Sequence, residues 1–290
     1  MTLILQKGLP VIDKLLKEGV DVHCIEYNEK NNINVRIAIV NLMPLKLDAE
    51  LDLLRRLSKT NYNIFIEFIK TTSRDSKREC NEYTQKYYKT IDKIQNDYFN
   101  GVIITGAPVE QMEFEEVDYW DELKYIMEYS RTKAKSTFHI CWAAQAGLYN
   151  FYNINKMKLD EKCFGVFEHK VNKNSKIVRE FKESFFAPHS RHTTVDINEI
   201  IQKNDLKVVS YSEDAGVYII EDNRDIFVMG HSEYSKYTLD NEYKRDLSRG
   251  LNIDLPRNYY ENNDYKKEPI PTWIEHSELL FKNWVEYYLI

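Results

Sequence analysis

The chain has 290 residues, of which 43% are hydrophobic and 30% are charged, and its formal net charge is -6 at pH 7. A chain of this length and composition can bury a large apolar core, so we expect a globular protein. The acidic balance provides no broad basic surface, which argues against binding to nucleic acid through attraction to the phosphate backbone.

The first residues, MTLILQKGLPVIDKLLKEGV, lack the basic, apolar and small-residue order of a secretion signal. No apolar run in the sequence is long enough to cross a bilayer. We therefore expect a cytoplasmic protein that does not insert into membranes. Its cysteines lack the paired spacing of a zinc site and the density of a disulfide scaffold, so free thiols are expected at Cys24, Cys80, Cys141 and Cys163.

Short apolar runs typical of strands alternate with helical patterns along the chain. Strands are predicted at residues 35–43, 62–69, 101–106, 136–141, 206–212, 216–221 and 225–231, and helices at 49–60, 80–95 and 119–132. The first four runs are apolar on both faces, which is typical of parallel strands covered by helices. This order predicts an α/β fold with a mostly parallel sheet flanked by helices.

The chain shows no internal repeat and no long linker rich in Pro, Gly or Ser. We therefore expect a single domain over residues 1–290, in which residues 1–34 form an N-terminal extension that packs on the α/β core. Residues that could take part in catalysis or binding follow four of the predicted strands. They are Lys46, the segment from Gly106 to Glu110, Cys141 and His231. Because ligands bind at the carboxyl ends of such strands, these positions predict one shared crevice.

The segment TFHICWAAQAGLY, residues 137–149, places Cys141 between a predicted strand and a run of small helix-forming residues. This is the pattern of a nucleophile elbow, where small neighbours leave room for a tight turn. The amides and dipole of the following helix would favour a thiolate and could donate to a developing oxyanion, the Trp142 amide among them. The motif alone leaves open a buried structural cysteine.

A thiolate nucleophile needs a base, and DIFVMGHSEY provides His231 with Glu233 two residues later. A carboxylate at that spacing can hold the imidazole in one tautomer and support its positive charge. A purely structural His231 is the alternative. His139 is expected to be a packed core residue, whereas surface or structural roles are expected for His23, His169 and His276.

An elbow cysteine with a later His-x-Glu is also the pattern of class I glutamine amidotransferases, so glutamine hydrolysis competes with other activities. The segments NLMPLK, ITGAPVE, FEEVDYWDEL, HICWAAQAGLY, FGVFEHKV, FAPHSRHT, GHSEY, TLDNEYKRD and LLFKNWVEYYL together resemble the homoserine O-acyltransferase family of methionine biosynthesis. The resemblance runs from about the first predicted strand to the C-terminus, with the motifs in family order. It implies a fold similar to the class I glutamine amidotransferases, that is, flavodoxin-like.

The resemblance implies roles for individual residues. Cys141 would carry the acyl group, His231 would be the general base and Glu233 its partner. The resemblance places the carboxylate of the amino-acid substrate on Arg245, which shares a helix face with Glu242 three positions earlier. A surface ion pair between these two residues is the alternative. Positions that the family uses around the acyl acceptor or near the site are matched by Lys162, Ser190 and Lys46, although Lys46 could equally be a solvated lysine.

Glu110 bears on the acyl donor. Members with glycine at the end of GAP-x-x look suited to a succinyl group, whereas a glutamate there resembles the acetyl-using members. A carboxylate at this place would fill the volume of a succinyl chain and repel its terminal charge. The alternative is that Glu110 only accepts hydrogen bonds at a turn.

The chain departs from the family pattern at three positions. Ser232 stands where the family has proline, Ala143 where many members have glycine, and Ala49 where threonine is expected. The last two departures leave homoserine and serine open as acceptors, because one methylene is worth only about 1–3 kcal/mol of discrimination. The expected reaction uses acetyl-CoA as co-substrate and L-homoserine as acceptor, in two half-reactions with ping-pong kinetics and with no metal or other cofactor. A succinyl donor, a glutamine amidotransferase-like hydrolase and a non-catalytic binding module are the alternatives. Family resemblance suggests a homodimer.

Overall fold

The computed structural model describes residues 2–26, 33–73 and 82–290. Its strands are β1 (Leu3–Gln6), β2 (Val22–Ile25), β3 (Val35–Val40), β4 (Ile64–Ile69), β5 (Tyr88–Lys89), β6 (Phe99–Ile104), β7 (Ala134–Ile140), β8 (Lys156–Val171), β9 (Ser184–Val195), β10 (Lys207–Ser212), β11 (Gly216–Glu221) and β12 (Ile226–Val228). Its helices are α1 (Val11–Lys17), α2 (Lys46–Leu57), α3 (Glu82–Tyr87), α4 (Ile91–Ile94), α5 (Trp120–Lys133), α6 (Trp142–Tyr152), α7 (Ile197–Ile201), α8 (Thr238–Ser248) and α9 (Ile274–Trp284). Single turns of 3-10 helix are η1 (Phe114–Glu116), η2 (Lys176–Val178) and η3 (Glu261–Asn263), and a π-helical segment, η4 (Val285–Leu289), follows α9.

The described strands form a 12-stranded sheet in the order β2-β1-β4-β3-β6-β7-β12-β11-β10-β8-β9, with β5 beside β4. Neighbouring strands are parallel from β2 to β12 and antiparallel from β12 to β9. The predicted α/β class with a mostly parallel sheet is therefore confirmed. The strands predicted at 35–43, 62–69, 101–106 and 136–141 are β3, β4, β6 and β7 of the parallel part.

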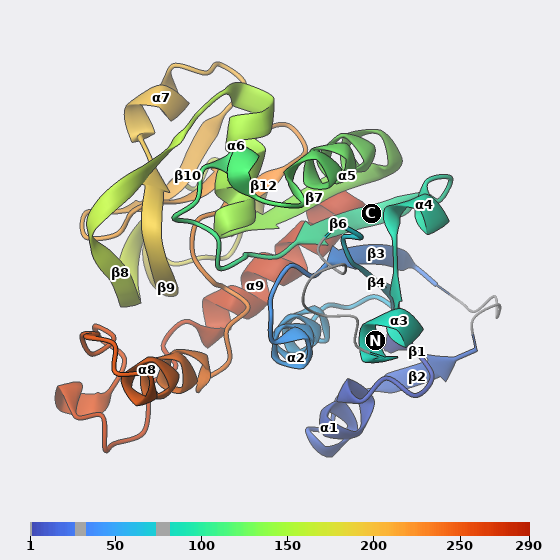
Figure 1. Cartoon of the computed structure of the whole chain (residues 1–290), viewed down its shortest axis with the longest axis horizontal. Helices are drawn as coiled ribbons and strands as arrows, with labels where there is room; N and C mark the ends of the chain where they lie inside the picture. Colours follow the sequence, from blue (N-terminus) through green and yellow to red (C-terminus); the bar gives the residue numbers. More distant parts are fainter. Residues whose placement is uncertain (1, 27–32, 74–81) are drawn as a thin grey trace.

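Helices cover both faces of this parallel part (Figure 1). In β3, Ile37 and Ile39 belong to an apolar cluster that includes residues of α1, α2 and α9. The alternate residues, Ala38 and Val40, belong to a second cluster built with α4 and α5. Both sets are buried because successive side chains of a strand point to opposite faces. This double coverage explains the continuous apolar runs in the sequence.

Several strands lie in segments where the sequence predicted none. In the N-terminal extension, β1 pairs with β4 and β2 pairs with β1, so these two strands lengthen the sheet, and α1 packs against it. The long strands β8 and β9 pair with each other over most of their length. Because β9 alternates buried and half-buried residues, a search for continuous apolar runs does not detect it.

The helix predicted at residues 80–95 is interrupted. Residues 80 and 81 lie outside the described residues, and α3 ends at Tyr87, where β5 begins. Tyr88 pairs with Phe68 of β4, and extended backbone at Thr90 then precedes the short helix α4. Pairing at the sheet therefore overrides the helical spacing of this segment.

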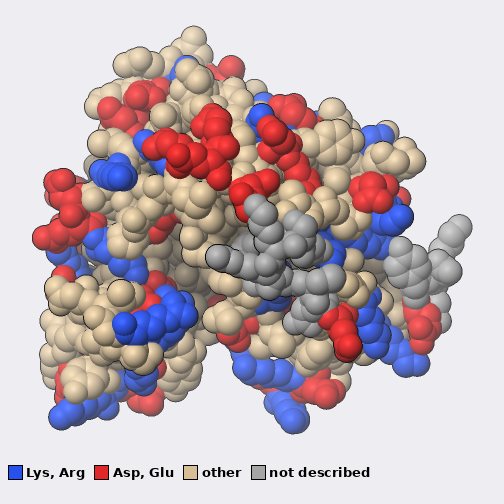
Figure 2. Space-filling model, viewed as in Figure 1, with Lys and Arg blue, Asp and Glu red and all other residues tan. Residues whose placement is uncertain are grey.

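Within the described residues, no helix is long and apolar enough to cross a membrane. The described cysteines Cys24, Cys141 and Cys163 are free thiols, as predicted, and Cys80 lies outside the described residues. On the face shown in Figure 2, Lys and Arg side chains are interspersed with Asp and Glu side chains. The described part of this face therefore presents charges of both signs rather than one extended basic stripe.

Candidate active site

Cys141 occupies a sharp turn between β7 and α6. Its backbone has φ 53° and ψ -114°, which is a strained conformation for a residue with a side chain. The Cys141 amide donates to the Val228 carbonyl of β12 at 2.7 Å, which ties the turn to the neighbouring strand. This strand-turn-helix geometry is that of the predicted nucleophile elbow.

Two glycines make room around this turn. A Cβ atom at Gly106 would lie 3.3 Å from Cys141 Cβ and 3.5 Å from His231 Cε1, so residue 106 lies directly beside both side chains. A Cβ at Gly147 would lie 2.8 Å from the ring of Phe227, so the small residue lets α6 approach β12 closely. The small residues after Cys141 therefore serve the packing of the elbow helix.

His231 is paired with Glu233 as predicted. Its Nδ1 lies 2.7 Å from Glu233 Oε1, and its ring stacks on Tyr234 with centroids 4.1 Å apart. Burial by itself would lower the pKa of His231, but the charges of Cys141 and Glu233 and hydrogen bonds to both raise it well above its ordinary value. The ring therefore links the carboxylate to the sulfur, which is the geometry of a Cys-His-acid triad.

The backbone that carries Glu233 and Tyr234 is held from two sides. Arg56 of α2, which is buried, donates through Nη2 to the Tyr234 carbonyl at 3.1 Å and through Nε to the Glu233 carbonyl at 3.5 Å. Trp273 donates its indole N–H to the same Tyr234 carbonyl at 2.9 Å. These contacts fix the turn that presents the acid and the stacking ring to His231.

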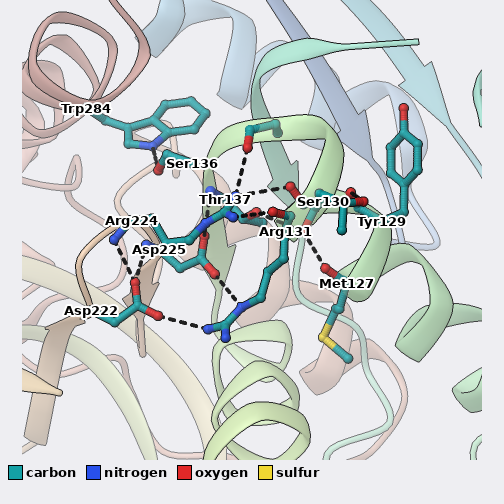
Figure 3. Close-up of polar contacts among 12 residues, drawn as sticks. Met127, Tyr129, Ser130, Arg131, Ser136, Thr137, Asp222, Arg224, Asp225 and Trp284 are labelled. Carbon is teal, nitrogen blue, oxygen red and sulfur yellow. Dashed lines mark hydrogen bonds and ion pairs between the residues drawn. The ribbon is translucent and has the colours of Figure 1, made fainter. Parts of the chain in front are cut away.

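A polar network at the other end of the sheet holds the two strands that carry Cys141 and His231 (Figure 3). Asp225, just before β12, accepts from the Thr137 amide of β7 at 3.0 Å. Its carboxylate also pairs with Arg131 at 3.1 Å and with Arg224 at 3.2 Å. Because Asp225 is fully buried, this charge cluster sets β12 beside β7 and thereby sets the register of base and nucleophile.

The triad opens into a pocket of about 350 Å³. Cys141, His231 and the segment from Gly106 to Glu110 all line it, as the strand ends predicted. The remaining predicted substrate-binding residues that line it come from β8, β9 and α8, and are Lys162, Ser190, Glu242 and Arg245. The structure therefore brings these sequence-predicted residues together at one crevice.

Glu242 is the centre of the polar wall of this pocket. Its Oε1 accepts from Ser190 Oγ at 2.5 Å and from Lys162 Nζ at 2.7 Å, and it lies 3.9 Å from Arg245 Nη2. Arg245 itself makes a shorter contact, 2.7 Å from Nε to Asp246 Oδ1. Arg245 and Glu242 approach each other, as the alternative interpretation of Arg245 expected, but the shorter contact of the guanidinium is with Asp246.

Glu110 also borders the pocket and is half-buried. Burial raises the pKa of its carboxyl, although a hydrogen bond from the His192 amide and the nearby charges of His192, His231 and Lys162 oppose the rise. A carboxylate at this place can repel a negatively charged acyl group bound at Cys141 and can exclude a long one by its volume. Its role as a selector of the donor stays a prediction.

Lys46 and Trp142 take other positions. Lys46 is the first residue of α2, and its Nζ donates to the Asn41 carbonyl at 2.7 Å, while the pocket lining after β3 consists of Met43 and Pro44. Trp142 has a fully buried side chain, and its amide is the first of α6. A helix leaves its first four N–H groups without intrahelical acceptors, so the predicted oxyanion role suits this amide and stays a prediction.

The lining residues that sequence reasoning missed include His192, Tyr234 and Asp246. These three lie inside quoted motifs: His192 alternates with Ser190 along β9, Tyr234 follows the triad acid, and Asp246 follows Arg245 on α8. The period of two in β9 could have identified His192, had that segment been recognised as a strand.

The other positions discussed from sequence are mostly structural. His139 and His169 are buried, as is His276, whereas His23 is exposed. Among the departures from the family pattern, the Ser232 hydroxyl hydrogen-bonds Tyr218, and Ala143 is buried in α6. Ala49 lines a second, neighbouring cavity rather than the pocket of the triad.

Solved structures similar to this chain share its fold. A glutamine amidotransferase of Thermotoga maritima has a TM-score of 0.60 and 16% identity, over 88% of this chain and 98% of that chain. A glutamine amidotransferase of Methylobacillus flagellatus has a TM-score of 0.52 and 8% identity, over 87% of this chain and 94% of that chain. At these identities the similarity shows the predicted amidotransferase-like fold alone.

Sequence relatives are much closer. A protein of Agathobacter rectalis named homoserine O-acetyltransferase is 48% identical to this chain, over 98% of this chain and 93% of the relative. A protein of Bacillus cereus with the same name is 47% identical, over 100% of this chain and 97% of the relative. A third, from Lachnoclostridium phytofermentans, is 51% identical over 88% of this chain and 86% of the relative. The model of the family described as homoserine O-succinyltransferase matches residues 2–290. The resemblance read from the motifs is confirmed, and the chain belongs to the homoserine O-succinyltransferase family.

Proposed function

We propose that this protein is a homoserine O-acetyltransferase that moves the acetyl group of acetyl-CoA to the hydroxyl of L-homoserine through an acyl-enzyme on Cys141. The observation that carries the proposal is the joint placement of the triad and the Glu242-centred wall around one pocket. Full-length relatives at 46–51% identity that are named homoserine O-acetyltransferase support it.

In the first half-reaction, His231 takes the thiol proton of Cys141, and the thiolate attacks the carbonyl carbon of acetyl-CoA. Amides at the start of α6 stabilise the tetrahedral oxyanion. The C–S bond to CoA breaks, and the CoA thiolate leaves with the proton held by His231. The raised pKa of His231 lets the imidazole hold the proton that it takes from the thiol.

In the second half-reaction, homoserine enters with its carboxylate toward Arg245. His231 takes the proton of its hydroxyl while the oxygen attacks the thioester carbonyl. The C–S bond to Cys141 breaks, the sulfur recovers its charge or its proton, and O-acetyl-L-homoserine leaves. The first step exchanges one thioester for another, and the second converts a thioester into a more stable oxygen ester, so neither needs more than the proton transfers that His231 would provide.

Two alternatives remain close in chemistry. A succinyl donor is favoured by the description of the family model, homoserine O-succinyltransferase, and opposed by the carboxylate of Glu110 at the pocket. A serine acceptor differs from homoserine by one methylene. Family resemblance further supports a place in methionine biosynthesis, a cytoplasmic location and a homodimer.

The test is intact-mass analysis of the protein with acetyl-CoA or succinyl-CoA, followed by a chase with homoserine or serine and by peptide mapping. The expected result is an acetyl adduct on Cys141 that homoserine discharges. A succinyl adduct, or discharge by serine alone, would replace the donor or the acceptor. Absence of any adduct, together with release of ammonia from glutamine, would favour a glutamine amidotransferase-like hydrolase, and an unreactive Cys141 would favour a binding module.

A further inference from the structure

A second cavity, of about 750 Å³, lies next to the pocket of the triad. It is bounded by α1, by α2, by the turn after His231 and by the start of α8. Thr238, the first residue of α8, donates a 2.9 Å hydrogen bond to Asp52 of α2. Residues that line both cavities are Met43, Tyr234, Glu242 and Arg245. The two spaces therefore share a wall beside the reacting groups.

The second cavity borders the acid of the triad. Glu233 lines it, and among the described residues none donates a hydrogen bond to Glu233 Oε2. Thr105, the neighbour of Gly106, also lines it. The Oε2 atom of Glu233 is itself buried, so the cavity borders the acid of the triad without exposing that atom.

Its lining suits a long uncharged chain better than a phosphate. Apolar contacts come from Met43, Leu45, Ala49 and the ring of Tyr237. Of the cations in the lining, Arg55 pairs with Glu18 at 2.8 Å, Lys236 with Glu268 at 2.7 Å and Arg245 with Asp246 at 2.7 Å, while Lys14 is exposed. An amide-bearing aliphatic chain would bury apolar surface against these residues, and most of the cations around it are already paired.

We propose that the second cavity holds the pantetheine arm of the acyl-CoA donor, while the 350 Å³ pocket receives the amino-acid acceptor. This inference rests on the proposed function and adds a binding site to it. The smaller pocket has room for an acetyl group and a small amino acid, whereas the donor's arm needs a separate path to Cys141. The nucleotide part of the donor then stays outside, at the mouth near Leu45, which is 57% exposed.

Ala49 gives the test because it is a small, half-buried residue of α2 that lines this cavity and not the other. Ala49→Phe should fill the path of the arm. Ala49→Leu, whose side chain is intermediate in volume, should fill it in part. Leu47→Phe is the control on the same helix, since Leu47 is 41% exposed and lies outside both linings. Two donors are compared, acetyl-CoA and S-acetyl-N-acetylcysteamine, which keeps only the amide nearest the thioester.

The expected result is a KM for acetyl-CoA raised at least about tenfold by Ala49→Phe and less by Ala49→Leu. The rate with the short thioester should stay within about twofold of the wild type in every variant. As a variant that spares the packed core, Leu45→Glu should raise the KM for the anionic acetyl-CoA, and added salt should reduce that effect.

An unchanged KM for acetyl-CoA in both Ala49→Phe and Leu45→Glu would overturn the donor site, as would equal losses with both donors. Failure of the proposed function has a different signature: the wild type would form no acetyl adduct on Cys141 from either donor. Variants are compared only after circular dichroism and thermal melts match those of the wild type, so that misfolding is not scored as a loss of binding.

Discussion

The selection of the acyl donor by Glu110 gives the sharpest single prediction. Replacing Glu110 by glycine should improve the use of succinyl-CoA relative to acetyl-CoA, because the change removes both volume and negative charge from the pocket. Glu110→Gln keeps the volume and removes the charge alone. The two variants therefore separate steric exclusion from electrostatic exclusion.

The magnitude follows from the surroundings of the carboxylate. Two unit charges about 5 Å apart at an effective dielectric constant of about 20 repel each other by about 3 kcal/mol. The charges of His192, His231 and Lys162 act on Glu110 in the opposite sense, so part of that repulsion is offset. We expect a net effect of about 1.4–2.8 kcal/mol, which is about ten- to hundredfold in the ratio of kcat/KM values.

The assay is CoA release with homoserine in excess, run with each donor at several pH values. Because burial raises the pKa of Glu110, its carboxyl takes up a proton at a higher pH than an exposed glutamate does. Discrimination against succinyl-CoA should therefore weaken as the pH falls in the wild type and stay flat in Glu110→Gln. Donor ratios that match the wild type in both variants would refute the selector role.

Three further predictions concern the acceptor and the scaffold. Arg245→Met should raise the KM for homoserine about ten- to hundredfold and change the KM for acetyl-CoA much less, although Arg245 also lines the second cavity. An equal rise in both KM values would move Arg245 to the donor step. Asp225→Ala should lower the free energy of unfolding by about 3 kcal/mol in urea titrations, because it removes a buried carboxylate that binds Arg131, Arg224 and the Thr137 amide. A loss below about 1 kcal/mol would make the network dispensable. Burial raises the pKa of Glu50 to about 7 against hydrogen bonds from tyrosines, so its contribution to stability is present below about pH 4.5 and is lost as the pH rises through about 7. Between about pH 4.5 and 7, the free energy of unfolding of the wild type should therefore fall by up to about 3 kcal/mol more than that of Glu50→Gln. Parallel pH curves for the two proteins would contradict this prediction.

The site could be predicted from sequence wherever a strand end carried a reactive residue. Cys141, His231 and Glu110 follow strands whose apolar runs are unmistakable, and parallel strands present their carboxyl ends at one edge. Asp246 could not be singled out in the same way, because a carboxylate beside an arginine on a helix is usually a solvated ion pair. Its placement at the pocket depends on how α8 lies over β8 and β9, which is a tertiary property.

Lys46 illustrates the limit of transfer by resemblance. The motif NLMPLK fixes its place after β3, but the direction of its side chain depends on α2, which begins at Lys46 itself. In this structure the ammonium group satisfies the Asn41 carbonyl at the end of that strand. A motif thus predicts where a residue lies along the chain, whereas the partner of a long, flexible side chain is decided by the groups left unsatisfied around it.

Burial around the triad also bears on why such an elbow would transfer an acyl group to an alcohol rather than to water. Cys141 is 5% exposed and His231 is 4% exposed, and Tyr234 covers one face of the imidazole. A thioester on Cys141 would therefore be approached through the pocket that the acceptor occupies. If homoserine fills that pocket as proposed, its hydroxyl would displace the water that could hydrolyse the intermediate, and the Glu242-centred wall would hold the amino acid in place. Binding of the acceptor and protection of the acyl-enzyme are then one event, so weakening the wall should raise hydrolysis of acetyl-CoA as transfer falls.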